Sequence, residues 1–308
     1  MGVKDLNQLL GTTIAELSDT NSMQGLFHEH RDGAPLPSGP ALQEIIDLCR
    51  AILLPGFYGN SNLNSQTLRF HIGVNVERLY QLLSEQIMAG LCFVQSKDEP
   101  VCPVEKGQRL AAEFIAKLPE IRQVLSTDIE AAYNGDPAAT NRGEIISCYP
   151  VIKAMSNYRI AHKLVKLGVP LIPRIITEMA HSETGIDIHP EASIGHHFTI
   201  DHGTGVVIGA TCIIGNNVKL YQGVTLGAKS FPLDEHGNPI KGIPRHPILE
   251  DNVIVYSNAT ILGRITIARD TVVGGNLWVT ESTKPGEHLV QAKKRKSAIV
   301  RPEDFGGL

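Results

Sequence analysis

The second half of the chain carries an aliphatic residue at every sixth position. One run of this repeat extends from Ile188 to Val224, and a second run resumes it from Leu249 to Val279. The members are Ile188, Ile194, Ile200, Val206, Cys212, Val218 and Val224, followed by Leu249, Val255, Ile261, Ile267, Val273 and Val279. A period of six fits neither a helix nor simple strand alternation, but it is typical of a short strand and a turn on each face of a triangular prism. The repeat therefore predicts a parallel β-helix over residues 184–282, with about 18 residues in each coil.

Two further features of the repeat lead to predictions. The residue four places after an aliphatic member is often small or polar, and we expect such side chains to share the narrow interior (Ala192, Thr204, Ala210, Ala259 and Thr271). The phase is unbroken from Ile188 to Val224, but the interval from Val224 to Leu249 is not a whole number of hexads. This interval contains a stretch rich in Pro and Gly at 229–244, which predicts a loop extruded from the solenoid for binding or assembly.

Residues 1–183 follow a helical pattern instead. Apolar stripes predict helices over 41–54, 67–91, 107–133, 145–167 and 172–181, whereas residues 1–40 remain poorly defined and 32–40 resemble a linker. Residues 283–308 form a C-terminal tail with a basic run at Lys293–Lys296. The predicted fold class is α+β, with an all-α N-terminal domain followed by the β-helix.

Composition narrows the function classes. The 308 residues carry a formal net charge of −4, which gives no reason to expect nucleic acid or an anionic membrane as partner. We find neither an apolar run long enough to span a bilayer nor a signal peptide, so we predict a cytoplasmic protein. The five cysteines are irregularly spaced and mostly lie in apolar segments, which favours buried free thiols.

The polar residues of the turns are the candidates for chemistry. Asp201 and His202 lie in a hexad whose outer surface is not needed for packing. A histidine beside a carboxylate can accept and return a proton near neutral pH. Asp187 lies upstream by slightly less than one coil, so spacing permits it to orient His202. Arg245 and His246 follow the extruded loop, where a guanidinium and an imidazole could hold a carboxylate. The alternative for each is a solvated surface residue.

Two other functions remain open at this point. His189, His196 and His197 could indicate zinc, as in a γ-class carbonic anhydrase, although neighbouring histidines point in divergent directions. The second of these functions is a non-catalytic assembly scaffold.

The motifs in their order resemble those of bacterial serine O-acetyltransferases of the hexapeptide-repeat superfamily. The similar segments are Asp128-Ile129-Glu130-Ala131, Asp136-Pro137, Thr184-Gly185-Ile186-Asp187-Ile188-His189-Pro190, Ile200-Asp201-His202-Gly203-Thr204-Gly205, Gln222-Gly223-Val224-Thr225-Leu226-Gly227 and Arg245-His246-Pro247. The resemblance implies that the β-helix is left-handed. It also implies transfer of acetyl from acetyl-CoA to the hydroxyl of L-serine, which gives O-acetyl-L-serine for cysteine biosynthesis. Another CoA-dependent acetyltransferase with a different acceptor is the nearest alternative.

The resemblance also implies roles for individual residues. His202 would be the general base and Asp187 would orient it, Asp136 and Asp201 would hold the substrate ammonium, and Arg245 and His246 would hold its carboxylate. Acetyl-CoA would lie in a crevice between two β-helices, without any metal, and the basic tail would lie near its phosphates. The predicted CoA contacts are Gly227, Ala228, Ser257 and Gly275.

The resemblance finally implies partners. Family members form trimers through their prisms and commonly hexamers through their helical domains, so we expect a homotrimer or a dimer of trimers. The C-terminal tail would be the segment that contacts O-acetylserine sulfhydrylase.

Overall fold

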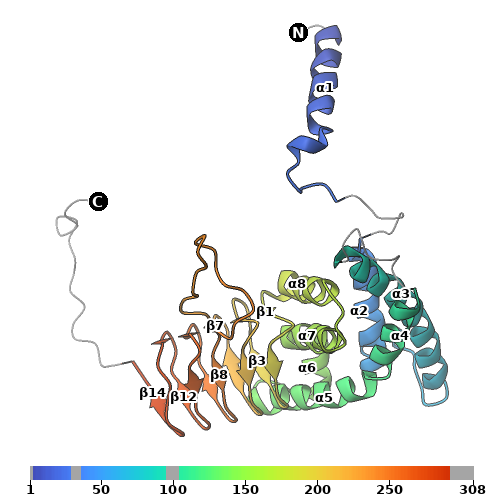
Figure 1. Cartoon of the computed structure of the whole chain (residues 1–308). Coiled ribbons are helices and arrows are strands. Elements are labelled where there is room, and N and C mark those ends of the chain that lie inside the picture. Colours follow the sequence, from blue (N-terminus) through green and yellow to red (C-terminus); the bar gives the residue numbers. More distant parts are fainter. Residues whose placement is uncertain (1–2, 29–35, 95–103, 292–308) are drawn as a thin grey trace, which may run out of the picture.

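The computed structural model describes residues 3–28, 36–94 and 104–291 of the chain. In these ranges the helices come first and the strands follow (Figure 1). The helices are α1 (Val3–Leu17), α2 (Gly39–Leu53), α3 (Leu68–Val94), α4 (Val104–Ile115), α5 (Leu118–Gly135), α6 (Arg142–Cys148), α7 (Pro150–Lys166) and α8 (Ile172–Thr184), with a 3₁₀ turn at Thr20–Ser22. The strands are β1 (Asp187–Ile188), β2 (Ser193–Ile194), β3 (Thr199–Asp201), β4 (Val207–Ile208), β5 (Ile213–Ile214), β6 (Lys219–Tyr221), β7 (Thr225–Gly227), β8 (Ile248–Leu249), β9 (Ile254–Val255), β10 (Thr260–Leu262), β11 (Thr266–Ile267), β12 (Val272–Val273), β13 (Trp278–Val279) and β14 (His288–Leu289).

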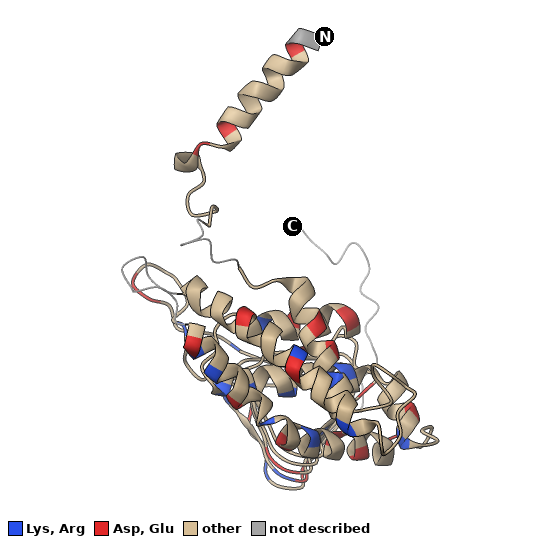
Figure 2. Ribbon diagram, turned by 90° about the vertical axis from the view of Figure 1, so that its right-hand side faces the viewer, with Lys and Arg blue, Asp and Glu red and all other residues tan. Residues whose placement is uncertain are grey.

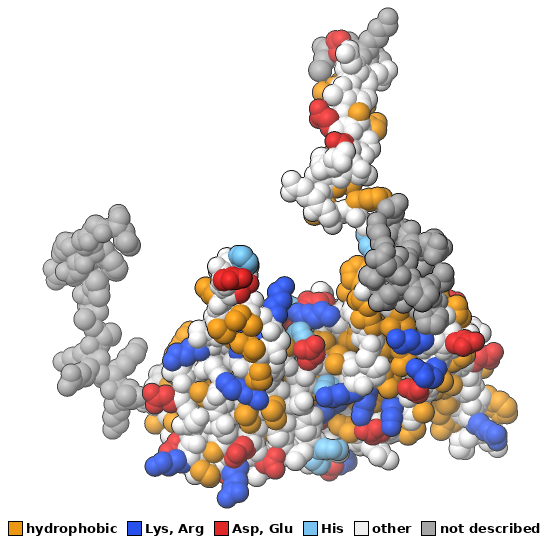
Figure 3. Space-filling model, viewed as in Figure 1, with side chains coloured by type: hydrophobic (Ala, Val, Ile, Leu, Met, Phe, Trp, Pro, Cys, Tyr) orange, Lys and Arg blue, Asp and Glu red, His pale blue; other side chains and the backbone are white. Residues whose placement is uncertain are grey.

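Proline positions explain where the helices begin. The stretches predicted as single helices over 107–133 and 145–167 are each two helices, α4 with α5 and α6 with α7. Pro119 and Pro150 lie in the first turns of α5 and α7. A proline has no N–H to donate and is tolerated at a helix start but not in its interior, so the apolar stripe continues while the helix breaks. Helix α1 was not predicted, and its apolar side chains are exposed in this structure (Figure 3).

The strands form three parallel sheets, one on each face of a prism. Their orders are β1-β4-β7-β10-β13 in the first sheet, β11-β8-β5-β2 in the second and β14-β12-β9-β6-β3 in the third. Each strand places an aliphatic side chain in the interior, and those of successive coils lie in register, as for Ile188, Ile208 and Leu226. This confirms the predicted fold class, a helical region followed by a parallel β-helix.

The register of the first coil differs from the prediction. Ile188 pairs with Ile208 and Ile208 pairs with Leu226, so the first of these two coils is longer than the second. The prediction of an unbroken six-residue phase from Ile188 to Val224 is therefore wrong, because the turn 201–205 contains two extra residues. Val206 is still buried, since it occupies the interior position just before that of Ile208. For the same reason Thr204 and Ala210 are not interior side chains, whereas the predicted interior residues of the other coils are fully buried (Ala192, Ala259 and Thr271).

Two connections depart from the coil. Leu226 and Leu249 pair with Ile208 and Ile214, which are one hexad apart, so the whole extruded loop is inserted within a single hexad. At the other end, β14 pairs with β12, and the solenoid therefore continues into the region predicted as tail. The predictions for the lysine run and for a partner at the C-terminus concern residues 292–308, outside the described ranges.

Helices α5 and α7 cover the first coil, and their side chains form hydrogen bonds with backbone groups at its open edge. Tyr158 donates its hydroxyl to the Ala192 carbonyl over 2.6 Å, and Arg159 donates to the carbonyls of Ile194 and Gly195. Asp128 holds Arg159 through both carboxylate oxygens at 3.1 and 3.0 Å, and it also accepts the N–H of Phe198. Most of these bonds are buried, and they hold α5 against the third sheet.

The cysteines differ in burial and bonding. Cys49 and Cys212 are free and buried, and burial raises the pKa of each thiol to about 12, whereas the free Cys148 is exposed. Cys92 is disulfide-bonded, so the prediction of free thiols is wrong there. Lys and Arg residues are interspersed with Asp and Glu residues along the ribbon (Figure 2). No helix within the described ranges is long and apolar enough to cross a membrane.

Candidate active site

His202 projects from the inserted turn 201–205. Its backbone has a φ of 60° and that of Gly203 has a φ of 102°, both in the left-handed region. A non-glycine residue rarely adopts this conformation, and where it does the surrounding structure must hold it. Gly205 N–H donates to the Gly185 carbonyl over 2.8 Å, and Asp187 N–H donates to the Val206 carbonyl over 2.9 Å. The imidazole itself is 74% exposed, so a rigid turn presents an accessible side chain.

Two carboxylates lie near this imidazole. Asp201 Oδ1 is 3.8 Å from His202 Nδ1. Asp136, just past the end of α5, accepts the Tyr149 hydroxyl over 2.5 Å and the Ala138 N–H over 2.8 Å. These bonds, with smaller contributions from the charges of nearby Lys219 and His202, hold the pKa of Asp136 below its usual range. The structure thus brings Asp136, Asp201 and His202 together.

Asp187 has a different partner. Its Oδ1 lies 3.5 Å from Nη1 of Arg174 on α8, and Arg174 also pairs with Glu178. Among the described residues, no hydrogen bond or ion pair joins Asp187 to His202. The two residues lie on adjacent coils, as their spacing predicts, but the Asp187 side chain is held by the helix.

Arg245 and His246 lie at the base of the extruded loop. Both backbone N–H groups donate to Thr211 Oγ1, at 2.9 and 3.1 Å, and the Thr211 N–H donates to His246 Nδ1 over 3.1 Å. A backbone N–H can only donate, so Nδ1 is an acceptor and the ring proton lies on Nε2. Burial, with the charge of Arg245 and further groups, lowers the pKa of His246 to about 4. His246 is therefore a neutral donor, and the Arg245 guanidinium has no partner among the described residues.

These groups lie on two different edges of the prism. The edge between the third and first sheets, here called the base edge, comprises the turns 202–206, 222–224, 256–259 and 274–277. The edge between the first and second sheets, here called the loop edge, comprises the turns 189–192, 209–212, 228–247 and 263–265. His202 lies on the base edge and His246 on the loop edge, so the first sheet separates them within one chain.

The predicted CoA residues divide in the same way. Ser257 and Gly275 lie on the base edge, in successive coils above His202, and the Ser257 carbonyl accepts the N–H of Asn276 over 2.9 Å. Gly227 ends β7 and Ala228 opens the extruded loop, so both lie at the loop edge. A hollow of about 270 Å³ beneath the loop is lined by Lys229, Arg245 and Arg264, among others.

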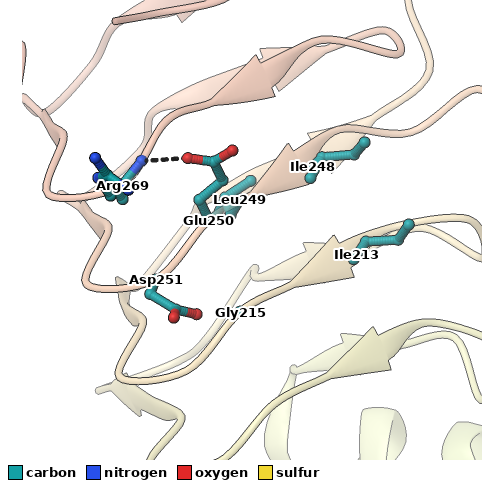
Figure 4. Close-up of a pocket in the computed structure, with 7 residues that line it drawn as sticks. All are labelled: Ile213, Gly215, Ile248, Leu249, Glu250, Asp251 and Arg269. Atoms are coloured by element: carbon teal, nitrogen blue, oxygen red, sulfur yellow. Dashed lines mark hydrogen bonds between the residues drawn. The ribbon is translucent and has the colours of Figure 1, made fainter. Parts of the chain in front are cut away.

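One further hollow lies away from both edges that carry these groups. A hollow of about 360 Å³ on the second sheet is lined by Ile213, Ile248 and charged residues, of which Glu250 accepts the Arg269 N–H (Figure 4). None of the predicted site residues lies there. Among the described residues the side chains that could jointly hold a metal ion are those of Glu178, His181 and Asp187. The guanidinium of Arg174 contacts two of these carboxylates, and the histidines that suggested zinc do not belong to the group.

Three residues that contact the predicted site residues were missed by sequence reasoning. Thr211 organises Arg245 and His246, Tyr149 binds Asp136, and Lys219 binds Asp201. A polar residue in a turn or on the outer face of a strand is most often solvated, so the sequence carries no signal that would have selected them.

The prism of hexad coils, with His202 on one edge and Arg245 and His246 on another, defines a hexapeptide-repeat protein. No protein-family model matches the chain. A curated relative from Synechococcus elongatus, the plasmid serine acetyltransferase, is 48% identical over 279 residues, which cover 89% of this chain and 86% of the relative. Two serine acetyltransferases from Entamoeba histolytica resemble the structure. Isoform 1 with L-cysteine has a TM-score of 0.71 at 33% identity and covers 90% of this chain and 94% of its own. Isoform 3 with cysteine has a TM-score of 0.70 at 32% identity and covers 96% and 94%.

This chain belongs to the serine acetyltransferase family. The family resemblance predicted from the sequence motifs is confirmed, and the protein is an acyltransferase.

Proposed function

We propose that the protein transfers the acetyl group of acetyl-CoA to the side-chain hydroxyl of L-serine, giving O-acetyl-L-serine and CoA. The observation that carries this proposal is the inserted turn that presents His202 beside Asp201 and Asp136. A histidine beside two carboxylates supports the proposal, because an amino-acid acceptor needs a proton acceptor next to carboxylates that can bind its ammonium group.

The acceptor is a zwitterion, and the two edges supply complementary charges. Asp136 and Asp201 hold the ammonium at the base edge. Arg245 holds the carboxylate at the loop edge, and His246 adds a hydrogen bond from Nε2. Because the two edges lie on opposite sides of the first sheet, we propose that one serine is held by the base edge of one protomer and the loop edge of a neighbour. A homotrimer with three prisms side by side provides three such sites.

His202 removes the hydroxyl proton as the serine oxygen attacks the thioester carbonyl. The resulting tetrahedral species collapses with cleavage of the carbon–sulfur bond, and the imidazolium returns its proton to the departing thiolate. Asp187 acts as the orienting carboxylate once its side chain turns from Arg174 to His202. Acetyl-CoA lies in the crevice between two neighbouring prisms. Ser257 and Gly275 of one protomer form one wall, and Gly227 and Ala228 of its neighbour form the other. No covalent enzyme intermediate is needed, since both substrates meet in one site.

An acceptor screen with acetyl-CoA and a thiol-release readout tests the reaction. L-Serine is expected to give the highest kcat/KM among amino acids and simple sugars. Thiol release with a sugar or another amino acid, and none with L-serine, would refute the proposal.

Subunit mixing tests the shared site. His202→Asn and Arg245→Ala chains, each with its own affinity tag, are co-expressed and the mixed trimers purified through both tags. If one protomer supplies His202 and its neighbour supplies Arg245, roughly one site in three is intact in every mixed trimer, and activity at low serine returns to about a third of the wild-type level. If a single chain supplies both residues, mixed trimers contain no intact site and stay as inactive as either variant alone.

A further inference from the structure

Lys219 binds Asp201 and lies close to Asp136. It is on β6, in the third sheet, and its side chain is 16% exposed. Its Nζ is 3.2 Å from Asp201 Oδ2 and donates to the Gly135 carbonyl over 2.7 Å. The ammonium also lies 4.6 Å from the centroid of the Tyr221 ring. Three separate contacts thus fix the position of one cation.

The contacts join two parts of the chain. Asp201 belongs to the solenoid, where it ends β3, whereas Gly135 is the last residue of α5 and directly precedes Asp136. The carbonyls at a helix C-terminus carry partial negative charge and are free to accept, so a lysine there stabilises the helix end. By binding Asp201 and Gly135 together, Lys219 sets where Asp136 lies relative to Asp201.

Charge balance points to the same role. Asp136 and Asp201 would together present two negative charges to a single ammonium, and they would repel each other. Lys219 leaves a net charge of about −1, which one ammonium neutralises. The other titratable groups facing this cluster are His202 beside Asp201, Tyr149 on Asp136, Glu144 near Tyr149, and Tyr221 beside Lys219.

We propose that Lys219 is a positioning residue for the acceptor ammonium, holding Asp201 and the Asp136 segment at the separation that a single ammonium bridges. This inference rests on the proposed function, because it assigns the ammonium to these two aspartates. Lys219 itself does not contact the reacting atoms. It acts through Asp201 and through the end of α5.

The test compares Lys219→Met, which keeps the length of the side chain, with Lys219→Arg, which keeps its charge and donors. In Lys219→Met we expect the KM for L-serine to rise about tenfold or more, the scale of a lost charge-assisted hydrogen bond, with kcat and the KM for acetyl-CoA within about threefold. Lys219→Arg should recover most of the loss. Lys163→Met removes a comparable ion pair with Glu120 on the helical region and serves as the matched control, with an unchanged serine KM.

A second acceptor analogue separates positioning from general damage. 3-Hydroxypropanoate lacks the ammonium, so its inhibition constant against L-serine should be the same in wild type and Lys219→Met. An unchanged serine KM in Lys219→Met would overturn the inference. So would an equal weakening of L-serine, 3-hydroxypropanoate and acetyl-CoA, which indicates a structural role, or a lower serine KM, which indicates that Lys219 competes with the ammonium. Failure of the wild-type enzyme to acetylate L-serine is a different result and would refute the proposed function itself.

Discussion

Thr211 and His246 are joined twice: the Thr211 N–H donates to His246 Nδ1 over 3.1 Å, and Thr211 Oγ1 lies 2.9 Å from the same nitrogen. The hydroxyl oxygen also accepts the backbone N–H groups of Arg245 and His246. One threonine in the turn after β4 thereby fixes the ring proton of His246 and the backbone that carries Arg245. The far end of the extruded loop is thus anchored to the solenoid at the place where the proposed carboxylate site begins.

Replacing Thr211 should weaken serine binding. Thr211→Val keeps the shape but removes the acceptor of two N–H groups, and we expect a serine KM about 5- to 30-fold higher with little change in the KM for acetyl-CoA. Steady-state kinetics with each substrate varied provides the measurement. Thr260→Val on β10, whose hydroxyl makes no hydrogen bond with described residues, is the control. If both variants behave alike, Thr211 does not organise the site.

His202→Asn should abolish most of the turnover. Asparagine tolerates the left-handed backbone at this position, so the turn is retained while the proton acceptor is lost. We expect kcat to fall by roughly 10²-fold or more, with the dissociation constant of CoA unchanged by calorimetry. His197→Asn changes a residue with a similar φ of 54° and should keep nearly full kcat. Retention of turnover in His202→Asn would exclude His202 as the general base.

Gly203→Ala should disturb the inserted turn. A Cβ on Gly203 would lie 2.5 Å from Ile186 Cδ1, and the φ of 102° is unfavourable for alanine. We expect a loss of about 1–3 kcal/mol in the free energy of unfolding, together with a lower kcat because the turn carries His202. Gly237→Ala in the extruded loop has a φ of 81° but nothing within 4 Å of its Cβ, so it isolates the backbone effect. Equal losses in both variants would show that the packing against Ile186 is unimportant.

Stability should decrease on acidification through His246. Its pKa is lowered from 6.5 to about 4, mainly by burial, so between these values the unfolded chain binds the proton more readily than the folded one. The stabilisation from the neutral imidazole is complete above pH 6.5 and is lost progressively as the pH falls toward 4. Burial lowers the pKa of His162 and His189 in the same sense.

Thermal unfolding at pH 7.5 and 5.0 checks this prediction at one protein concentration, since assembly also affects stability. The decrease in Tm between the two values should be smaller in His246→Asn, whose amide oxygen can replace Nδ1 as acceptor without titrating. Parallel decreases in wild type and variant would contradict the assignment to His246.

The sequence predicted the β-helix because each strand must bury an aliphatic side chain, and this requirement recurs at every sixth position regardless of distant contacts. It missed the two extra residues in the turn that carries His202. Each coil face has two interior positions. In the coil of Val206 and Ile208 both are aliphatic, so Val206 continues the periodic pattern although Ile208 is the true partner of Ile188. Hydrophobic periodicity cannot distinguish these positions. The helix breaks at Pro119 and Pro150 were missed because the apolar stripe continues across them.

Residue type and motif identified the candidate site residues in the turns, such as His202, Arg245 and His246. They did not predict that these residues lie on two different edges of the prism. That distribution follows from how many residues each coil contains and where the loop leaves it, which only the folded chain determines. Tertiary contacts also decided the local partners. Arg174 forms an ion pair with Asp187. Lys219 forms an ion pair with Asp201 and donates a hydrogen bond to the last residue of α5. The spacing of these pairs along the chain follows no period, so the sequence could not predict them. The sequence alone determined the coil and the candidate site residues. Packing of the helices on the solenoid determined which of these residues contact one another.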